Sequence, residues 1–242
     1  MIRTKFKRIL GWSNRRIEEI RKGNSGDWAW LTVKPMPLAV LNRKLWKVAE
    51  PALTYYVLLA LSVVIATLGL LANSAATIIG AMIVAPLMGP ILGMAFSVVM
   101  SNRRLLRRST LSLITGTLMS IAIGAVICRL VGIQTLTPEI IARTSPNLLD
   151  LGVALAAGSA GAFAFSRRDI ADALPGVAIA VALVPPLSVV GIGIALNLQS
   201  VTFGSLLLFL TNLTGIVFSG GLVLLLQRYG SIDRAKKDCW LQ

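Results

Sequence analysis

Two short stretches place prolines inside the most apolar parts of this sequence. APLMGP occupies residues 85–90 and VPPL occupies residues 184–187. A proline in a helix interior costs about 3 kcal/mol, because it cannot donate to the carbonyl four residues earlier. Lipid offers such a carbonyl no partner, so protein or water must supply one. We therefore predict two interrupted helices that present backbone carbonyls and helix ends to an ion or a small polar solute. The residues that shape this site are Pro86, Gly89, Pro90, Pro185 and Pro186.

The same residues also fit a purely structural interpretation. Proline and glycine are more frequent in membrane helices than in soluble ones, so the two stretches can be simple packing kinks. Gly89 and Gly93 also form a GxxxG pattern, which lets two helices approach closely. The sequence leaves both interpretations open.

Four polar side chains in apolar segments are candidates for contact with the same solute. Counting the six long apolar segments along the chain, Asn73 lies just before the second (75–100), Asp169 and Asp172 lie at the opening of the fifth (175–196), and Asn212 lies in the middle of the sixth (201–227). A carboxylate there binds a cation or takes up a proton from the cytoplasmic side, or it caps a helix. A buried amide contacts a ligand or links two helices.

The composition places these residues in a membrane protein. Of the 242 residues 55% are hydrophobic and only 14% are charged, and the mean hydropathy is +0.77. A membrane-crossing helix needs about 20 apolar residues. Six stretches meet or nearly meet this length, so we predict an all-α polytopic protein with six transmembrane helices at residues 52–72, 75–100, 109–131, 148–166, 175–196 and 201–227.

The net charge of +14 is better explained by the orientation of the protein in the membrane than by nucleic-acid binding. If both termini are cytoplasmic, all Lys and Arg except Arg129 and Arg143 fall on the cytoplasmic side, which is the positive-inside bias. Residues 1–22 and 37–48 show helical spacing of apolar residues among basic ones. We expect amphipathic helices there that lie on the anionic inner leaflet.

An internal repeat organises the six predicted helices. A shift of 96 residues aligns GAMIVAPLMGPI (80–91) with GVAIAVALVPPL (176–187). Each half then holds three helices with the proline break in its second helix, and an odd number of crossings gives the halves opposite orientation. The predicted parts are a basic surface segment (1–50), repeat 1 (51–131), an extracytoplasmic loop (132–147), repeat 2 (148–227) and a basic tail (228–242).

The residue content argues against an enzyme. The sequence has no histidine, which removes histidine-based zinc and Ser-His chemistry. Asp169 and Asp172 have no second intramembrane carboxylate at a spacing that suggests a dyad. Cys128 and Cys239 are interpreted as unpaired thiols, and we expect no cofactor and no metal.

NSAATIIGAMIVAPLMGPILG (73–93), followed by LPGVAIAVALVPPL (174–187), resembles the uncharacterised bacterial hydrophobic-domain membrane protein family called domain of unknown function 389 (DUF389). The resemblance covers about residues 50–227. It implies a multi-pass protein of the bacterial inner membrane and supplies no substrate or catalytic residue.

The leading functional hypothesis is a secondary transporter with alternating access between the two repeats. One alternative is a passive channel along the repeat interface or an oligomer axis. Another is a non-transporting scaffold or stress-signalling component, in which the prolines only shape packing. We expect a homo-oligomer, because small residues such as those of ALAAGSAGAFA (154–164) favour close helix contacts.

Overall fold

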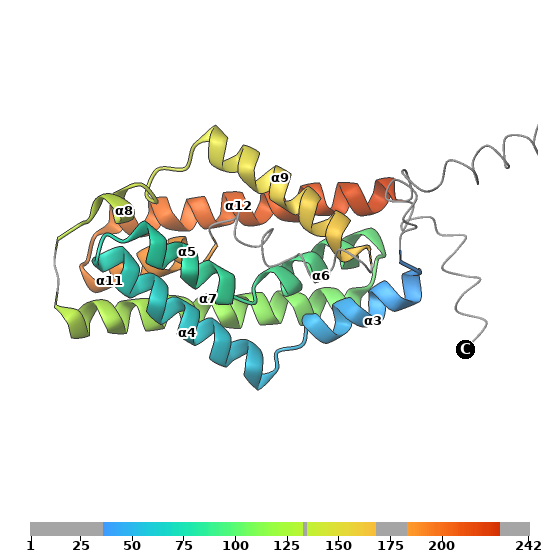
Figure 1. Ribbon diagram of the computed structural model, residues 1–242, viewed down its shortest axis with the longest axis horizontal. Helices are drawn as coiled ribbons and strands as arrows, with labels where there is room; N and C mark the ends of the chain where they lie inside the picture. Colours follow the sequence, from blue (N-terminus) through green and yellow to red (C-terminus); the bar gives the residue numbers. More distant parts are fainter. Residues whose placement is uncertain (1–35, 133–134, 168–182, 228–242) are drawn as a thin grey trace, which may run out of the picture. The chain divides into compact units, whose positions relative to one another are not determined.

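The computed structural model describes residues 36–132, 135–167 and 183–227, and the regular structure within these ranges is entirely helical. Figure 1 shows the helices as a bundle whose members run mostly along its long axis. Residues 1–35, Asp169, Asp172 and residues 228–242 lie outside the described ranges, and so do the predictions made for them. The helices are α3 (Leu38–Val48), α4 (Leu53–Leu71), α5 (Ala75–Val84), α6 (Met88–Val99), α7 (Arg103–Val131), α8 (Pro138–Ile141), α9 (Leu148–Phe165), α11 (Val184–Ala195) and α12 (Gln199–Leu226).

Four of the described helices are long and apolar enough to cross a membrane, namely α4, α7, α9 and α12. The pair α5–α6 makes a fifth crossing if its two parts are counted as one span, and they are bent by 55° at the break between them. The apolar helix α11 has only 12 residues. The residues expected to complete its span belong to 168–182, which the structure does not describe.

Large apolar side chains cover the outer faces of these helices. Leu118 of α7, Phe203 and Phe218 of α12 and Leu149 of α9 are each more than 60% exposed. A soluble monomer rarely exposes apolar surface on this scale. These apolar outer faces suit a membrane environment, in agreement with the setting expected from composition.

Helix α7 extends beyond the apolar run expected to begin at residue 109. It has 29 residues, a length of about 43 Å, which exceeds the hydrocarbon core of about 30 Å. Asn102 caps its first turn by accepting a hydrogen bond from the N–H of Leu105 at 3.2 Å. The additional turns carry Arg103, Arg104, Arg107 and Arg108.

Helices of the two halves of the chain pack on each other reciprocally. Helix α6 of the first half packs on α12, and α11 of the second half packs on α7. Within each half the first helix packs on the third, α4 on α7 and α9 on α12. One large apolar core joins residues of all these helices, and a smaller second cluster includes Leu70, Ile78, Cys128, Ile140 and Ile192.

Two pairs of helices keep the 96-residue spacing of the sequence repeat. Met88 and Val184 begin α6 and α11, and each helix has 12 residues. Arg103 and Gln199, which begin α7 and α12, are separated by the same interval. Figure 1 shows the members of each pair running in opposite directions along the bundle.

The turns between these helices also match. Ser101 after α6 has φ of 52°, and Asn197 after α11 has φ of 57°. In the first turn the N–H of Asn102 bonds the carbonyl of Ser97 at 2.9 Å, and in the second the N–H of Leu198 bonds that of Gly193 at 2.8 Å. The turn between α4 and α5 has the same form, since Asn73 has φ of 54° and the N–H of Ser74 bonds the carbonyl of Gly69 at 2.9 Å, so this geometry is common to three helix ends.

The segment expected as a loop at residues 132–147 contains the short helix α8. Thr137 caps α8, and its hydroxyl donates to the carbonyl of Leu70 at the end of α4 at 2.7 Å. Ser205 of α12 donates to the carbonyl of Arg143 at 2.9 Å. These bonds tie the loop to both halves of the chain.

Candidate functional site

The first proline break lies between α5 and α6. Ala85 leaves the helix with an extended backbone (φ −67°, ψ 123°), and the half-buried Pro86 follows it. In a continuing helix the N–H of residue 85 would bond the carbonyl of Ala81. Here the buried hydroxyl of Ser62 on α4 donates to that carbonyl at 2.7 Å. A protein side chain therefore satisfies this carbonyl. The carbonyl that Pro86 itself leaves without its helical donor is the next one, that of Met82.

The other prolines lie at helix beginnings. Pro90 is the third residue of α6, and Pro185 and Pro186 are the second and third residues of α11. In a first turn the N–H has no partner within the helix, so its loss costs nothing there. The interior-proline cost of about 3 kcal/mol expected from the sequence is therefore avoided at these three positions.

The two glycines of the GxxxG pattern contact helix α3 and the start of α7. A methyl group added to Gly89 would meet the side chain and the carbonyl oxygen of Val48. One added to Gly93 would lie 2.7 Å from the hydroxyl oxygen of Ser109 and 3.2 Å from the β-carbon of Ala49. Both glycines thus permit close packing of α6, which favours the structural interpretation of these two residues.

The described residues next to the two breaks are mainly apolar. Leu87 and Met88 at the start of α6, and Leu183, Val184 and Leu187 at the start of α11, are all buried in the same large core. The beginnings of both half-helices therefore belong to the one large core of the bundle, in which α6 packs on α12 and α11 packs on α7. This core surrounds them with hydrocarbon side chains in the part of the chain that is described.

Asn212 lies on the face of α12 that enters this core. It is 5% exposed, and its neighbours one turn away, Phe209 and Ile216, are core residues. The residue 96 positions earlier is Gly116, and a methyl group there would lie 2.5 Å from the hydroxyl oxygen of Tyr55. The equivalent positions of α12 and α7 thus have different polar groups, the amide of Asn212 in one case and the phenol of Tyr55 beside Gly116 in the other.

Asn73 lies away from the break. It is exposed in the turn between α4 and α5, with φ of 54°, and its side-chain oxygen accepts a hydrogen bond from the N–H of Glu139 at 3.3 Å. Ten residues of α5, about 15 Å of helix, separate it from the break. Asn73 and the prolines therefore do not share one site. The helix cap of α5 is Ser74, which accepts from the N–H of Thr77.

Two buried serines near the breaks did not figure among the candidates from the sequence. Ser62 is the one that bonds Ala81. Ser188 lies one turn into α11, is fully buried, and its hydroxyl has no hydrogen-bond partner among the described residues. The signal that could have found both is a single hydroxyl inside a long apolar run.

The reciprocal contacts between the halves are unequal. A methyl group on Gly124 of α7 would lie 3.0 Å from the carbonyl oxygen and 3.3 Å from the α-carbon of Ser188, so the backbones of α7 and α11 nearly touch. At the equivalent Gly220 of α12, the nearest atom of α6 is a side-chain methyl of Leu92 at 3.4 Å. Helices α7 and α11 are therefore packed more closely than α12 and α6.

Comparison with known proteins places the chain in a family. Residues 82–218 match the domain of unknown function DUF389, a stretch that includes both half-helices and Asn212. An uncharacterised protein of the archaeon Methanocaldococcus jannaschii is 28% identical over 201 residues, which are 81% of this chain and 62% of that protein. This chain thus spans less than two thirds of the relative's length, and an archaeal relative does not support the expected restriction to bacteria. No solved structure matches the chain. The match covers more than half of the sequence, so the chain belongs to the DUF389 family.

Proposed function

We propose that this protein is a secondary transporter of an ion or a small polar solute, with alternating access between two inverted repeats of three membrane-crossing segments each. The observation that carries the proposal is the pair α6 and α11. Both are 12-residue half-helices that begin with prolines in one shared core, and they run in opposite directions (Figure 1). Paired interrupted helices of this kind form the binding sites of many secondary transporters.

Reciprocal packing supports the movement that such a transporter needs. Each half-helix lies against the long third helix of the other half, so one repeat can tilt against the other while both contacts persist. One contact is close, between α7 and α11, and the other is looser, between α6 and α12. In the proposed cycle the two interfaces exchange these arrangements, which opens the site to opposite sides of the membrane in turn.

The proposed substrate site lies where the half-helices begin. The free N–H groups of Met88, Gly89 and Val184 are at the positive ends of the two helix dipoles, which favours an anion or the negative end of a polar solute. Asn212 adds an amide on the same core. Asp169 and Asp172, from the undescribed part of the fifth span, are the proposed coupling groups for a proton or Na⁺.

The proposed setting is the bacterial inner membrane with both termini in the cytoplasm and several copies in one complex. The arginines at the start of α7 support the orientation, because basic residues are retained on the cytoplasmic side.

A reconstitution experiment tests the transport proposal. The full chain in liposomes is assayed for saturable uptake and counterflow of radiolabelled cations, anions and small polar solutes. Counterflow supports a carrier, whereas single-channel currents without counterflow indicate the passive channel. For a transported substrate, Asp169→Asn and Asp172→Asn are expected to change the pH or Na⁺ dependence. Unchanged dependence would remove both from the coupling role.

Paired cysteines test the proposed exchange of interfaces. Gly124→Cys with Ser188→Cys spans α7 and α11, and Leu92→Cys with Gly220→Cys spans the equivalent positions of α6 and α12. Both pairs are placed in a background with Cys128→Ala and Cys239→Ala. We expect a cross-link at either pair to stop counterflow and a reductant to restore it. Full counterflow through a cross-linked protein would contradict the mechanism.

A specific observation favours the non-transporting scaffold as the second candidate. The described surroundings of both breaks are mainly apolar, and Gly89 and Gly93 serve close packing against α3 and α7. A scaffold predicts no flux and no stabilisation by any solute in the panel. Solute-dependent stabilisation of the folded protein would argue against it.

A further inference from the structure

The loosely packed interface between α6 and α12 contains an open groove of about 470 Å³. Its lining is almost wholly apolar, and the hydroxyl of Thr214 is the side-chain polar group in it. Gly221 opens its floor, since a methyl group there would still lie 3.7 Å from the nearest atom of Val99. Met94, Val98 and Val99 of α6 form one wall, and Leu213, Phe218 and Leu225 of α12 form the other.

The length of the groove matches one leaflet of a bilayer. Along α12 it reaches from Leu213 to Leu225, which is about 18 Å of helix. Half of the hydrocarbon core is about 15 Å thick. A single extended acyl chain of one leaflet therefore fits its length and its apolar lining.

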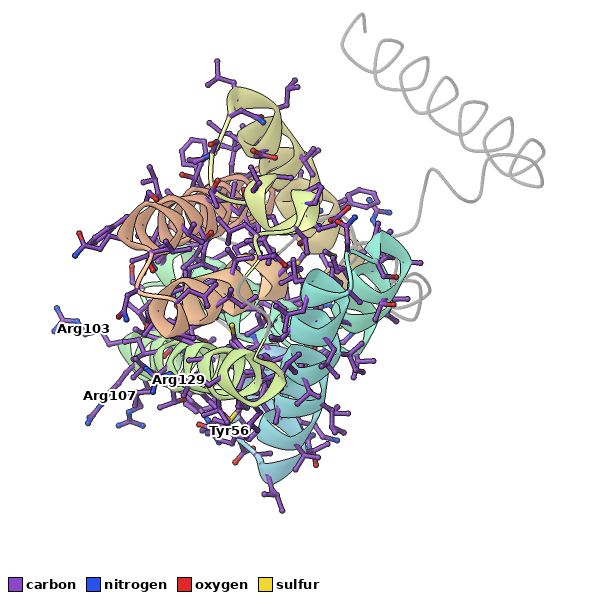
Figure 2. The ribbon with its side chains drawn as sticks, turned by 90° about the vertical axis from the view of Figure 1, so that its left-hand side faces the viewer. Tyr56, Arg103, Arg107 and Arg129 are labelled. Carbon is purple, nitrogen blue, oxygen red and sulfur yellow. The ribbon has the colours of Figure 1, made fainter. Side chains whose placement is uncertain are left out.

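The groove ends beside a cluster of arginines. Val99 is the last residue of α6, and a tight turn of three residues leads to Arg103, so these two α-carbons are at most about 14 Å apart. Arg103 and Arg107 are one helical turn apart and exposed. Figure 2 shows both side chains projecting on the same side of α7, away from α4.

Arg103 and Arg107 interact unfavourably with the dipole of α7, because they lie at its N-terminal end. Positive charge at a helix N-terminus opposes the dipole, and no acidic residue lies in the first turn of α7 to offset it. Arg108 differs, because it forms an ion pair with Glu50 and stacks on Trp46 at 5.3 Å. At the equivalent start of α12 the chain has Gln199 and Ser200. An anionic group outside the protein would relieve this unfavourable charge.

We propose that the α6–α12 groove holds an acyl chain of an anionic phospholipid whose phosphate contacts Arg103 and Arg107. The apolar groove and the arginines together match both parts of such a lipid, whereas a zwitterionic lipid would lack the net charge that the arginines select. Because the groove is the looser of the two reciprocal interfaces, the bound lipid stabilises the arrangement described here. This site is independent of the transport proposal.

Lipid-dependent thermal stability of the delipidated full chain in detergent tests the site. The probes are dioleoylphosphatidylglycerol, dioleoylphosphatidylcholine and glycerol phosphate, which separate an anionic lipid, a neutral lipid and the soluble headgroup. Phosphatidylglycerol is expected to raise the Tm more than phosphatidylcholine, and glycerol phosphate is expected to have no effect. Arg107→Gln should weaken the apparent affinity for phosphatidylglycerol about fivefold, and the double change Arg103→Gln, Arg107→Gln about thirtyfold. Arg129→Gln, at the other end of α7, is the control and should leave the affinity unchanged.

Filling the groove tests the acyl-chain part of the site. Gly221→Leu should abolish stabilisation by phosphatidylglycerol. Gly152→Leu is its matched control, because Gly152 is an exposed helical glycine with open space around it outside the groove. Equal stabilisation of Gly221→Leu and wild type would overturn the proposal. Equal stabilisation by phosphatidylglycerol and phosphatidylcholine would also overturn it, and so would a comparable effect of glycerol phosphate. A Gly221→Leu variant that changes its oligomeric state but keeps its lipid affinity would overturn it as well.

Discussion

The hydroxyl of Ser62 on α4 donates a hydrogen bond of 2.7 Å to the carbonyl oxygen of Ala81, one turn before the α5–α6 break. This bond joins α4 to α5 at the position where the backbone hydrogen bonds of α5 end. Ser62 and Ala81 are both fully buried. The break therefore depends on a neighbouring helix for part of its hydrogen bonding, which links its stability to the packing of α4.

Replacing Ser62 tests this dependence. Ser62→Ala should lower the free energy of unfolding by about 1–3 kcal/mol, because a buried carbonyl loses its partner. Ser120→Ala is the matched control, since the buried hydroxyl of Ser120 donates to the carbonyl of Gly116 in its own helix at 2.7 Å. That carbonyl keeps its helical N–H partner, so the control should lose less. Equilibrium unfolding in mixed micelles measures both, and equal losses would contradict the role given to Ser62.

The unequal interfaces predict opposite responses to the same substitution. A methyl group on Gly191 would lie 2.5 Å from the carbonyl oxygen of Ile121 and 2.7 Å from the backbone nitrogen of Ala125. These are backbone atoms that cannot turn aside, so Gly191→Ala should destabilise the protein by about 1–3 kcal/mol. Gly221→Ala adds its methyl group to the open groove and should be neutral or gain up to about 1 kcal/mol of helix propensity. Thermal unfolding of both variants decides, and a comparable loss in Gly221→Ala would show that the α6–α12 interface is as close as α7–α11.

The sequence predicts single helices well where long apolar runs define them. The first span was expected at residues 52–72, and α4 covers Leu53–Leu71. The break near Pro86 was also expected, because a proline disrupts the hydrogen-bond ladder wherever the helix lies. The start of α7 at Arg103 was not, since hydropathy measures only the membrane-embedded part of a helix that continues into the headgroup region.

The sequence could not predict which helices meet. Gly89 was a candidate both for the solute site and for packing, and only the fold shows that Val48 of α3 lies against it. Asn73 is likewise far from the α5–α6 break, because Asn73 lies before the first residue of α5 and the break follows its last residue. The contact of Ser188 with Gly124, in contrast to that of Leu92 with Gly220, joins residues far apart in the chain. Repeat spacing makes such pairs equivalent but does not say which pair is close.

The contact between Gly89 and Val48 gives a prediction that separates packing from a solute role. Gly89→Ala should destabilise the fold, because its methyl group meets the Val48 side chain. Adding Val48→Ala removes the nearest atoms, so the double variant should recover about 0.5–3 kcal/mol relative to the sum of the single changes. Val40→Ala is the control, since Val40 lies on the same helix and is 39% exposed, close to the 37% of Val48. Additive losses in the Gly89–Val48 cycle would show that this contact does not determine the cost at Gly89.

Three exposed turns of the same backbone geometry are suitable positions for testing the topology of the membrane segments. Asn73, Ser101 and Asn197 each have positive φ and are exposed at the end of a helix. The proposed inverted repeat would place Ser101 in the cytoplasm and Asn73 and Asn197 on the opposite side, because in it one crossing separates Asn73 from Ser101 and three separate Ser101 from Asn197. Single cysteines at these positions, in a background with Cys128→Ala and Cys239→Ala, are labelled with a membrane-impermeant maleimide in intact cells and in inverted vesicles. We expect Asn73→Cys and Asn197→Cys to react in cells and Ser101→Cys to react in inverted vesicles. Reaction of Ser101→Cys and Asn197→Cys from the same side would require an even number of crossings between them, and the two halves could then no longer exchange roles across the membrane.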